Sequence, residues 1–113
     1  MRSWYPLGKR RDFERLYREG TRFRSPLLTL VVRAEAQPGA WRAATVCSKK
    51  AGGAVVRNLL KRRLRNLLDE VTWPEQRSGD LAIICKPEVA AAPFAEMARH
   101  VQRLVARAGL EEA

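Results

Sequence analysis

The spacing of apolar residues along the chain predicts three helices. In the first, Phe13, Leu16 and Tyr17 stand at i, i+3 and i+4 and form one apolar stripe, and Gly20 follows as a helix-ending residue. The other two helices are longer, and each keeps an apolar face along its length. The three helices are expected over residues 9–19, 54–71 and 93–108.

The two long helices should pack on a sheet through their apolar faces. In the helix over residues 54–71, this face consists of Val56, Leu60, Leu64, Leu67 and Val71. In the helix over residues 93–108, it consists of Phe94, Met97, Val101, Leu104, Val105 and Ala108. The faces opposite them are polar and are left for solvent or for a partner.

Four stretches rich in apolar and β-branched residues predict strands over residues 21–24, 27–34, 41–48 and 80–86. The Gln-Pro-Gly turn before Trp41 predicts that the second and third strands run antiparallel to each other. The last stretch has a continuous apolar centre, as expected of an inner strand covered on both faces.

The order of elements is α-β-β-β-α-β-α in a single domain over residues 1–113, with residues 1–8 as an extended lead-in and 109–113 as a tail. This order predicts the α/β (α+β) class and a two-layer sandwich of a small mixed sheet with helices. The strand-helix-strand order around the middle helix implies a parallel pair joined by a crossover, which general rules make right-handed.

Charge is distributed unevenly along the chain. The net charge is +10, and residues 47–65 hold seven basic residues and no acid, whereas residues 66–113 hold five basic and eight acidic residues. Clustered positive charge is typical of a nucleic-acid-binding protein. No apolar run approaches the roughly 20 residues of a membrane span, and residues 1–20 lack the apolar centre of a signal peptide. We therefore expect a cytoplasmic protein without a membrane partner.

On the middle helix, Arg57, Lys61 and Arg65 share one face, and residues 47–65 contain no acid to pair with them. Lys49 and Lys50 precede the helix N-terminus, whose free amides also attract phosphate. A solvated face would mix charges, and a membrane-surface helix would need the apolar face that the core requires. A polyanion with phosphates spaced along a groove fits this pattern best.

Residue types that carry catalysis or bind metal are few. With one His and two Cys, and without a Walker-type phosphate loop, neither a zinc site nor a Ser-His-Asp arrangement is expected. We expect His100 on a solvated helix surface, and Cys47 and Cys85 as structural buried cysteines outside any disulfide framework. The pattern therefore predicts no catalytic side chain and no metal ligand on this chain.

Phe13 and Tyr17 allow two interpretations. Aromatic residues on one helix stripe commonly pack in a core. A ring at the border of a groove can instead stack on a nucleotide base. The residues alone leave both interpretations open.

Within the basic stretch, the chain reads Ser48-Lys49-Lys50, Gly52, Ala54-Val55, Arg57-Asn58, Lys61-Arg62 and Arg65. This pattern resembles the signature of the bacterial ribonuclease P protein component. Asp12-Phe13, Gly20-Thr21 and residues 80–86 are similar to further parts of the family pattern, so the resemblance extends over residues 7–108. Two positions stand as departures from the motif: Leu59 replaces the second arginine of an Arg-Asn-Arg motif, and Asn66 follows the last arginine, where an acidic or amide residue is usual. In the cleft, Val31 stands where an aromatic residue can occur in the family.

The resemblance implies a protein that binds the catalytic RNA of ribonuclease P and precursor tRNA, one protein per RNA, and assists removal of the 5′ leader. The RNA would carry out the hydrolysis with Mg²⁺, and the protein side chains would bind no cofactor. Contacts to the catalytic RNA would come from Lys49, Lys50, Arg57, Asn58, Lys61, Arg62 and Arg65. A cleft for the leader would be lined by Phe13, Tyr17 and Lys86. The family also implies a left-handed crossover through the basic helix, against the general rule.

Two other classes of protein remain open from the sequence. One is a ribosomal or other structural RNA-binding protein of the same fold, and the other is a basic DNA-binding module. A DNA reader places side chains on base edges, whereas A-form RNA is recognised through shape and phosphate contacts. Cleavage of precursor tRNA together with a ribonuclease P RNA would distinguish these classes.

Overall fold

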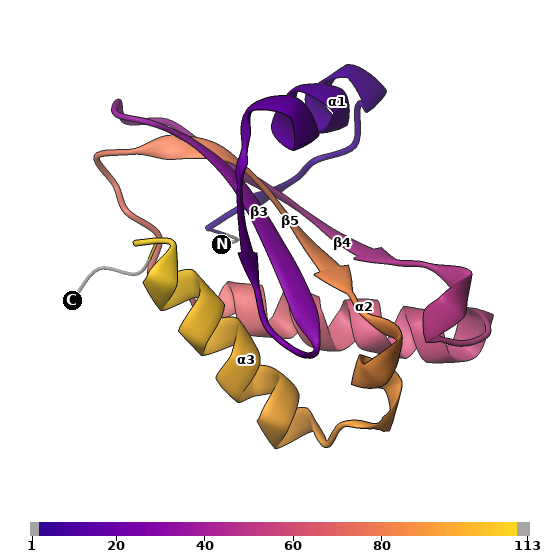
Figure 1. Ribbon diagram of the computed structural model, residues 1–113. Coiled ribbons are helices and arrows are strands. Elements are labelled where there is room, and N and C mark those ends of the chain that lie inside the picture. Colours follow the sequence, from indigo (N-terminus) through magenta and orange to yellow (C-terminus); the bar gives the residue numbers. More distant parts are fainter. Residues whose placement is uncertain (1–2, 111–113) are drawn as a thin grey trace.

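The computed structural model describes residues 3–110, which form three α-helices and one five-stranded sheet (Figure 1). The strands are β1 (Tyr5–Pro6), β2 (Thr21–Arg24), β3 (Leu28–Glu35), β4 (Trp41–Cys47) and β5 (Ser78–Cys85). The helices are α1 (Arg10–Glu19), α2 (Ala54–Asp69) and α3 (Phe94–Arg107), with short 3₁₀ turns η1 (Lys49–Ala51) and η2 (Pro87–Ala91). All predicted helices and strands are present, and β1 is an additional short strand within the lead-in. The ends of the predicted lead-in and tail, residues 1–2 and 111–113, lie outside the described residues.

The sheet is mixed and has the strand order β1-β4-β5-β3-β2. The central strand, β5, is parallel to β4 and antiparallel to β3. The strands β3 and β4 run in opposite directions, as predicted, but they are not the neighbours that their short connection suggests, because β5 lies between them. The continuous apolar centre of β5 explains this position, since only a central strand is covered on both faces.

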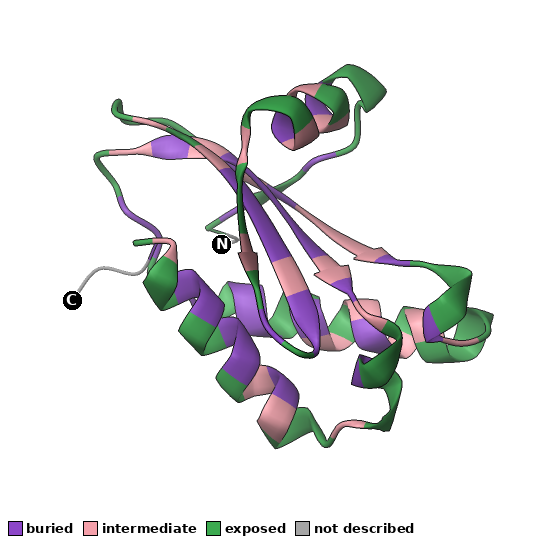
Figure 2. Ribbon diagram, in the orientation of Figure 1, coloured by how far each residue is buried: buried purple, intermediate pink, exposed green. Residues whose placement is uncertain are grey.

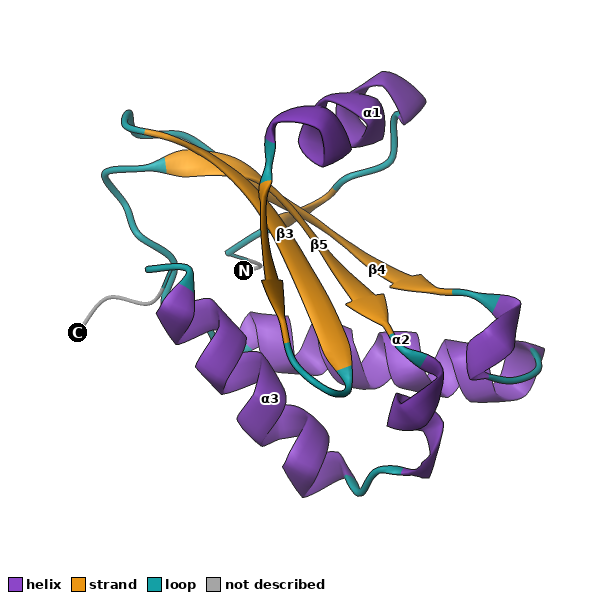
Figure 3. Ribbon diagram, in the orientation of Figure 1, coloured by secondary structure: helices purple, strands orange, loops and turns teal. Residues whose placement is uncertain are grey.

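Helices cover both faces of the sheet to different extents. Figures 1 and 3 show α2 and α3 on one face and α1 on the other, near one end of the strands. The predicted two-layer sandwich is formed by the sheet with α2 and α3, and α1 adds partial cover to the second face. None of the described helices combines the length and apolar character that crossing a membrane requires.

Strand alternation divides the buried side chains between two cores. Leu28, Leu30 and Val32 of β3 belong to the larger core under α2 and α3, whereas Val31 belongs to a smaller core with Leu16 of α1. Figure 2 shows the buried residues along the central strands and on the helix faces that meet them. This second, smaller core fixes α1 against the sheet.

Three residues differ from the predicted burial. Val56 and Phe94 were expected on apolar core-facing stripes, but both stand in the first turns of their helices and are 39% and 44% exposed. His100 was expected at a solvated surface, but it is buried, and its Nδ1 lies 2.8 Å from Ser25 Oγ. Helical periodicity shows the side on which a residue lies, whereas the extent of the neighbouring element decides whether that side is covered.

Candidate nucleic-acid interface

The basic stretch forms the turn η1 and the helix α2 that follow β4. Lys49 and Lys50 lie in η1 with exposed side chains, and the chain then passes through Gly52 into the helix. Gly52 has a φ of +143°, which residues with a side chain rarely adopt, and a Cβ there would lie 2.9 Å from Val56. Glycine is therefore required between the two lysines and the helix.

The N-terminus of α2 is open to an anion. Gly53 occupies the cap position, and no side chain accepts a hydrogen bond from the amides of the first turn. No acidic residue occupies the first turn either. The free amides and the helix dipole therefore add to the attraction that the preceding lysines exert on a negatively charged group.

The cations of the basic stretch, at positions 49, 50, 57, 61, 62, 63 and 65, form no ion pair with an acid within residues 3–110. The sequence does place Asp69 at i+4 from Arg65, but its carboxylate accepts a hydrogen bond from Trp4 Nε1 at 2.8 Å and makes no ion pair with Arg65. Arg57 Nε is buried and has no hydrogen-bond partner among the described residues. The positive charge of this surface is therefore not neutralised within the described part of the chain.

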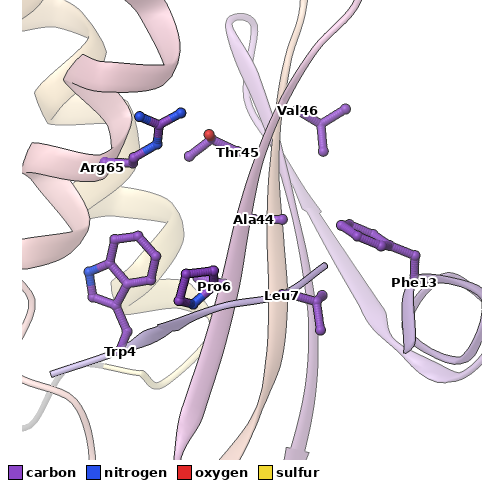
Figure 4. Close-up of a pocket in the computed structure, with 9 residues that line it drawn as sticks. Trp4, Pro6, Leu7, Phe13, Ala44, Thr45, Val46 and Arg65 are labelled. Carbon is purple, nitrogen blue, oxygen red and sulfur yellow. The ribbon is translucent and has the colours of Figure 1, made fainter. Parts of the chain in front are cut away.

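The cations of α2 lie beside β4. Lys61 and Arg57 lie close enough to Cys47, at the end of β4, to act electrostatically on its thiol. One turn further along α2, the guanidinium of Arg65 lies near Thr45 of the same strand (Figure 4). The cations predicted to share one face of α2 therefore lie beside a single strand, β4.

A cavity of about 450 Å³ surrounds the open edge of β4. It is lined by Trp4, Pro6, Leu7, Phe13, Ala43, Ala44, Thr45, Val46 and Arg65. Figure 4 shows Phe13, Leu7 and Val46 on one side of the strand and Arg65 and Thr45 on the other. Because β1 pairs with β4 only at positions 42 and 43, the edge of β4 from residue 44 to 46 is open to this cavity. The cavity therefore connects the basic face of α2 with the aromatic side of α1.

A partly buried ionic network sets the position of α1 and hence of Phe13. Arg42 on β4 donates hydrogen bonds to both carboxylate oxygens of Asp80, at 2.8 and 3.0 Å, and to Asp12 of α1 at 3.0 Å. Hydrogen bonding to Asp80 is the main cause that raises the pKa of Arg42, and burial opposes it. Since Asp12 precedes Phe13, this network fixes the ring beside the edge of β4.

The three residues predicted to line the cleft do not all meet at this cavity. Phe13 lines it, and the ring of Tyr17 lies 6.1 Å from that of Phe13, under the guanidinium of Arg22. Burial raises the pKa of Tyr17, and the charge of Arg22 opposes this effect. Lys86 is not a lining residue, because it lies after the end of β5 and its Nζ donates a hydrogen bond to the carbonyl of Ser25 at 2.6 Å.

The sequence did not point to Trp4, Pro6 or Thr45 as site residues. They join the cavity because β1 pairs in parallel with β4, an association between segments more than 30 residues apart. A two-residue strand has no periodicity of its own. The aromatic and proline residues of the lead-in were the only signal of this pairing.

Fold and site together define a small, basic α+β protein with an unneutralised cationic helix beside an open strand edge. The Ribonuclease P family model matches residues 1–109. The chain therefore belongs to the ribonuclease P protein family.

Individual relatives agree with this assignment. A ribonuclease P protein component of Thermus thermophilus is 44% identical over 69 residues, which are 61% of this chain and 40% of that protein. A ribonuclease P protein component of Streptococcus pneumoniae is 29% identical over 101 residues, or 89% of this chain and 81% of that protein. The match thus spans less than half the length of the Thermus relative but most of the Streptococcus relative.

Solved structures share the fold. The RNase P protein of Staphylococcus aureus superposes with a TM-score of 0.84 at 20% identity, covering 96% of this chain and 98% of that one. The RNase P protein of Thermotoga maritima superposes with a TM-score of 0.77 at 23% identity, covering 90% and 96%. At identities of 20% and 23%, the similarity shows a shared arrangement of helices and strands and no more.

Proposed function

We propose that this chain is the protein subunit of a ribonuclease P and that the basic surface of η1 and α2 binds the catalytic RNA. The residues proposed to contact RNA are Lys49, Lys50, Arg57, Asn58, Lys61, Arg62 and Arg65. The observation that carries the proposal is that the cations of this surface, in a chain of this family, have no acidic partner among the described residues. Phosphates along an RNA groove would supply the missing negative charge.

The cavity at the edge of β4 is proposed to hold the single-stranded 5′ leader of precursor tRNA. Phe13 offers a half-buried ring on which a base can stack, and Arg65 offers a cation on the opposite side of the strand for a phosphate. Tyr17 extends the aromatic surface beside Phe13. Lys86 would contact the leader only beyond the cavity, since its amino group is held at Ser25.

Hydrolysis is assigned to the RNA in this proposal. Within residues 3–110, no group of three or more His, Cys, Asp or Glu side chains is placed to hold a metal ion. In this proposal, divalent metal ions such as Mg²⁺ act with the RNA in the assembled enzyme. The protein's part is to bind one RNA, to hold the leader and to favour precursor over mature tRNA.

A reconstitution experiment tests the proposal. The purified protein is mixed with a bacterial ribonuclease P RNA and precursor tRNA at low magnesium concentration, and release of the 5′ leader is measured. We expect faster cleavage at the mature 5′ end than with RNA alone. Tight RNA binding without any gain in cleavage would instead favour a structural RNA-binding protein of the same fold, and equal affinity for duplex DNA would favour a DNA-binding module.

A triple variant locates the interface. Replacing Arg57, Lys61 and Arg65 by Ala should weaken binding of the catalytic RNA by at least about tenfold, since hydrogen bonds to charged groups contribute roughly 1.5–3 kcal/mol each. A matched control removes three exposed arginines elsewhere, at positions 10, 99 and 103, and should bind nearly as well as the unmodified protein. Equal losses in both variants would show that only overall charge matters.

A further inference from the structure

The two cysteines of the chain lie side by side at the carboxyl ends of two neighbouring strands. Cys47 ends β4 and Cys85 ends β5, and the two residues are direct partners in the parallel register. Their Sγ atoms lie 2.7 Å apart, and both cysteines are free. Neighbouring strands are about 4.8 Å apart, which lies within the Cα separation of roughly 4.4–6.8 Å that a disulfide spans. A bond between these sulfurs would therefore need little movement of the backbone.

The surroundings of the pair distinguish the two thiols. Both residues are buried, at 7% and 4% exposure, under the first half of α2. The hydrogen bond with Cys85 and the charges of Lys61 and Arg57 lower the pKa of Cys47, against the effect of burial. The hydrogen bond with Cys47 and burial raise the pKa of Cys85. These directions favour Cys47 as the thiol that ionises more readily, and a thiolate at Cys47 would accept a hydrogen bond from the Cys85 thiol, 2.7 Å away.

We propose that Cys47 and Cys85 are an oxidisable pair that forms a reversible disulfide between β4 and β5, with a hydroperoxide as the oxidant. The Cys47 thiolate attacks the terminal oxygen of the hydroperoxide and the O–O bond breaks. Cys47 becomes a sulfenic acid, and the other oxygen takes up the proton lost by Cys47 and leaves as water or an alcohol. The Cys85 sulfur then attacks the Cys47 sulfur, the S–S bond forms, and the sulfenic oxygen leaves with the Cys85 proton as water. With hydrogen peroxide, the two thiols lose two electrons and two protons, and the peroxide is reduced to two molecules of water.

The position of the bond defines its effect. The disulfide would enclose residues 47–85, a segment that contains η1, the whole of α2 and the whole of β5. Closing this segment restricts the unfolded chain more than the folded one. Oxidation would therefore stabilise the folded state of the segment that carries the cationic surface. This inference does not depend on which RNA the surface binds.

Oxidation of the folded protein tests the proposal directly. The reduced protein is treated with hydrogen peroxide, quenched, unfolded and alkylated, and then analysed by intact mass and peptide mapping. We expect a monomer that has lost the mass of two hydrogen atoms and takes up no alkylating reagent, with Cys47 and Cys85 in one cross-linked peptide pair. A dithiol reductant should restore two alkylated cysteines. Two alkylated cysteines after oxidation, a disulfide-linked dimer, or over-oxidised Cys47 beside free Cys85 would each overturn the proposal.

Single variants test the roles of the two sulfurs and the effect on stability. In Cys85→Ala, peroxide should leave a sulfenic acid at Cys47 that dimedone traps, whereas Cys47→Ala should give little trapping at Cys85. The melting temperature of the unmodified protein should rise on oxidation by about 10 °C or more, and neither variant should show this rise. An equal rise in a single variant would show that the effect does not come from the bond between β4 and β5.

Discussion

Phe13 and Arg65 come from opposite sides of the sheet and line the same cavity. They can do so because β4 is bordered by only two residues of β1, so that a narrow strand edge separates the two side chains. An aromatic ring on one side and a cation on the other offer a base and its phosphate separate contacts. The side chains of Phe13 and Arg65 would therefore determine how a single nucleotide is held.

Replacing Phe13 by Ala should reduce the preference for precursor over mature tRNA. Stacking of one base on an aromatic ring contributes about 1–3 kcal/mol, so we expect a loss of roughly 5- to 160-fold in affinity for precursor tRNA. Affinities of the assembled enzyme for both tRNAs would be measured side by side. Tyr17→Phe, which keeps the ring, serves as the control, and equal losses for both tRNAs in Phe13→Ala would identify Phe13 as a core residue only.

Asp80→Ala should strongly destabilise the fold. Asp80 is 2% exposed and accepts two hydrogen bonds from Arg42, whose side chain is 35% exposed, and losing a hydrogen bond to a charged group costs about 1.5–3 kcal/mol. The loss would be measured as the free energy of unfolding in urea. Glu14→Ala breaks an exposed i,i+4 pair with Arg10 and should change this free energy by less than about 1 kcal/mol. Similar losses in both variants would contradict the role of this partly buried network.

The predicted site residues differ in how well the sequence described them. The face shared by Arg57, Lys61 and Arg65 follows from helical spacing and is found in the structure, because local geometry alone determines it. His100 was predicted at the surface, which was wrong. It is buried, and its ring contacts Ser25, which lies 75 residues away along the chain. Lys86 follows the predicted strand, but its amino group is held by a carbonyl that no local pattern reveals.

At the level of elements, the turn between β4 and α2 depends on one glycine. The backbone of Gly52 lies at φ +143° and ψ −175°, a region that is essentially limited to glycine. This conformation joins the lysines of η1 to the helix that carries the cations of α2. The relative position of these two groups of charges is therefore set by a residue without a charge.

Gly52→Ala should destabilise the protein by about 1–3 kcal/mol, because alanine is strained at this backbone conformation and its Cβ would meet Val56. Binding of the catalytic RNA should weaken as well, since Lys49 and Lys50 would be displaced from α2. Gly53→Ala is the matched control, because Gly53 has a φ of −71° and open space around its Cβ position. Thermal unfolding and RNA affinity of the two variants would be compared. If both variants behave alike, backbone strain at Gly52 does not organise the turn.

The sequence predicted the helices and strands better than it predicted which strands pair with each other. The periodicity of the chain predicts the three helices and four strands within a few residues, because each pattern is local. The position of β5 between β3 and β4, and the pairing of β1 with β4, come from contacts between distant segments. The apolar centre of residues 80–86 predicted an inner strand, but local spacing did not identify both of its neighbours or the pairing of β1, so the open edge of β4 could not be foreseen.

For the whole molecule, the net charge of +10 makes salt dependence the broadest test. If about six phosphates are contacted, affinity for RNA should fall by on the order of 10³ between 50 and 200 mM salt. Arg57→Ala and Arg65→Ala should each reduce the slope of log affinity against log salt by about one. Arg10→Ala, which removes a cation already paired with Glu14, should leave the slope unchanged. Unchanged slopes in the α2 variants would place the RNA on another surface.

The central place of β5 also determines when the fold can form during synthesis. β5 is the last strand of the chain, yet it joins β3 to β4, so the sheet stays divided until residue 85 has been made. At roughly 5–20 residues per second, β4 waits about 2–8 seconds for its partner. During this interval the apolar inner edges of β3 and β4 lack a partner strand, and they are open to association with other chains. Translation speed between β4 and β5 should therefore influence how much of the protein reaches its folded state.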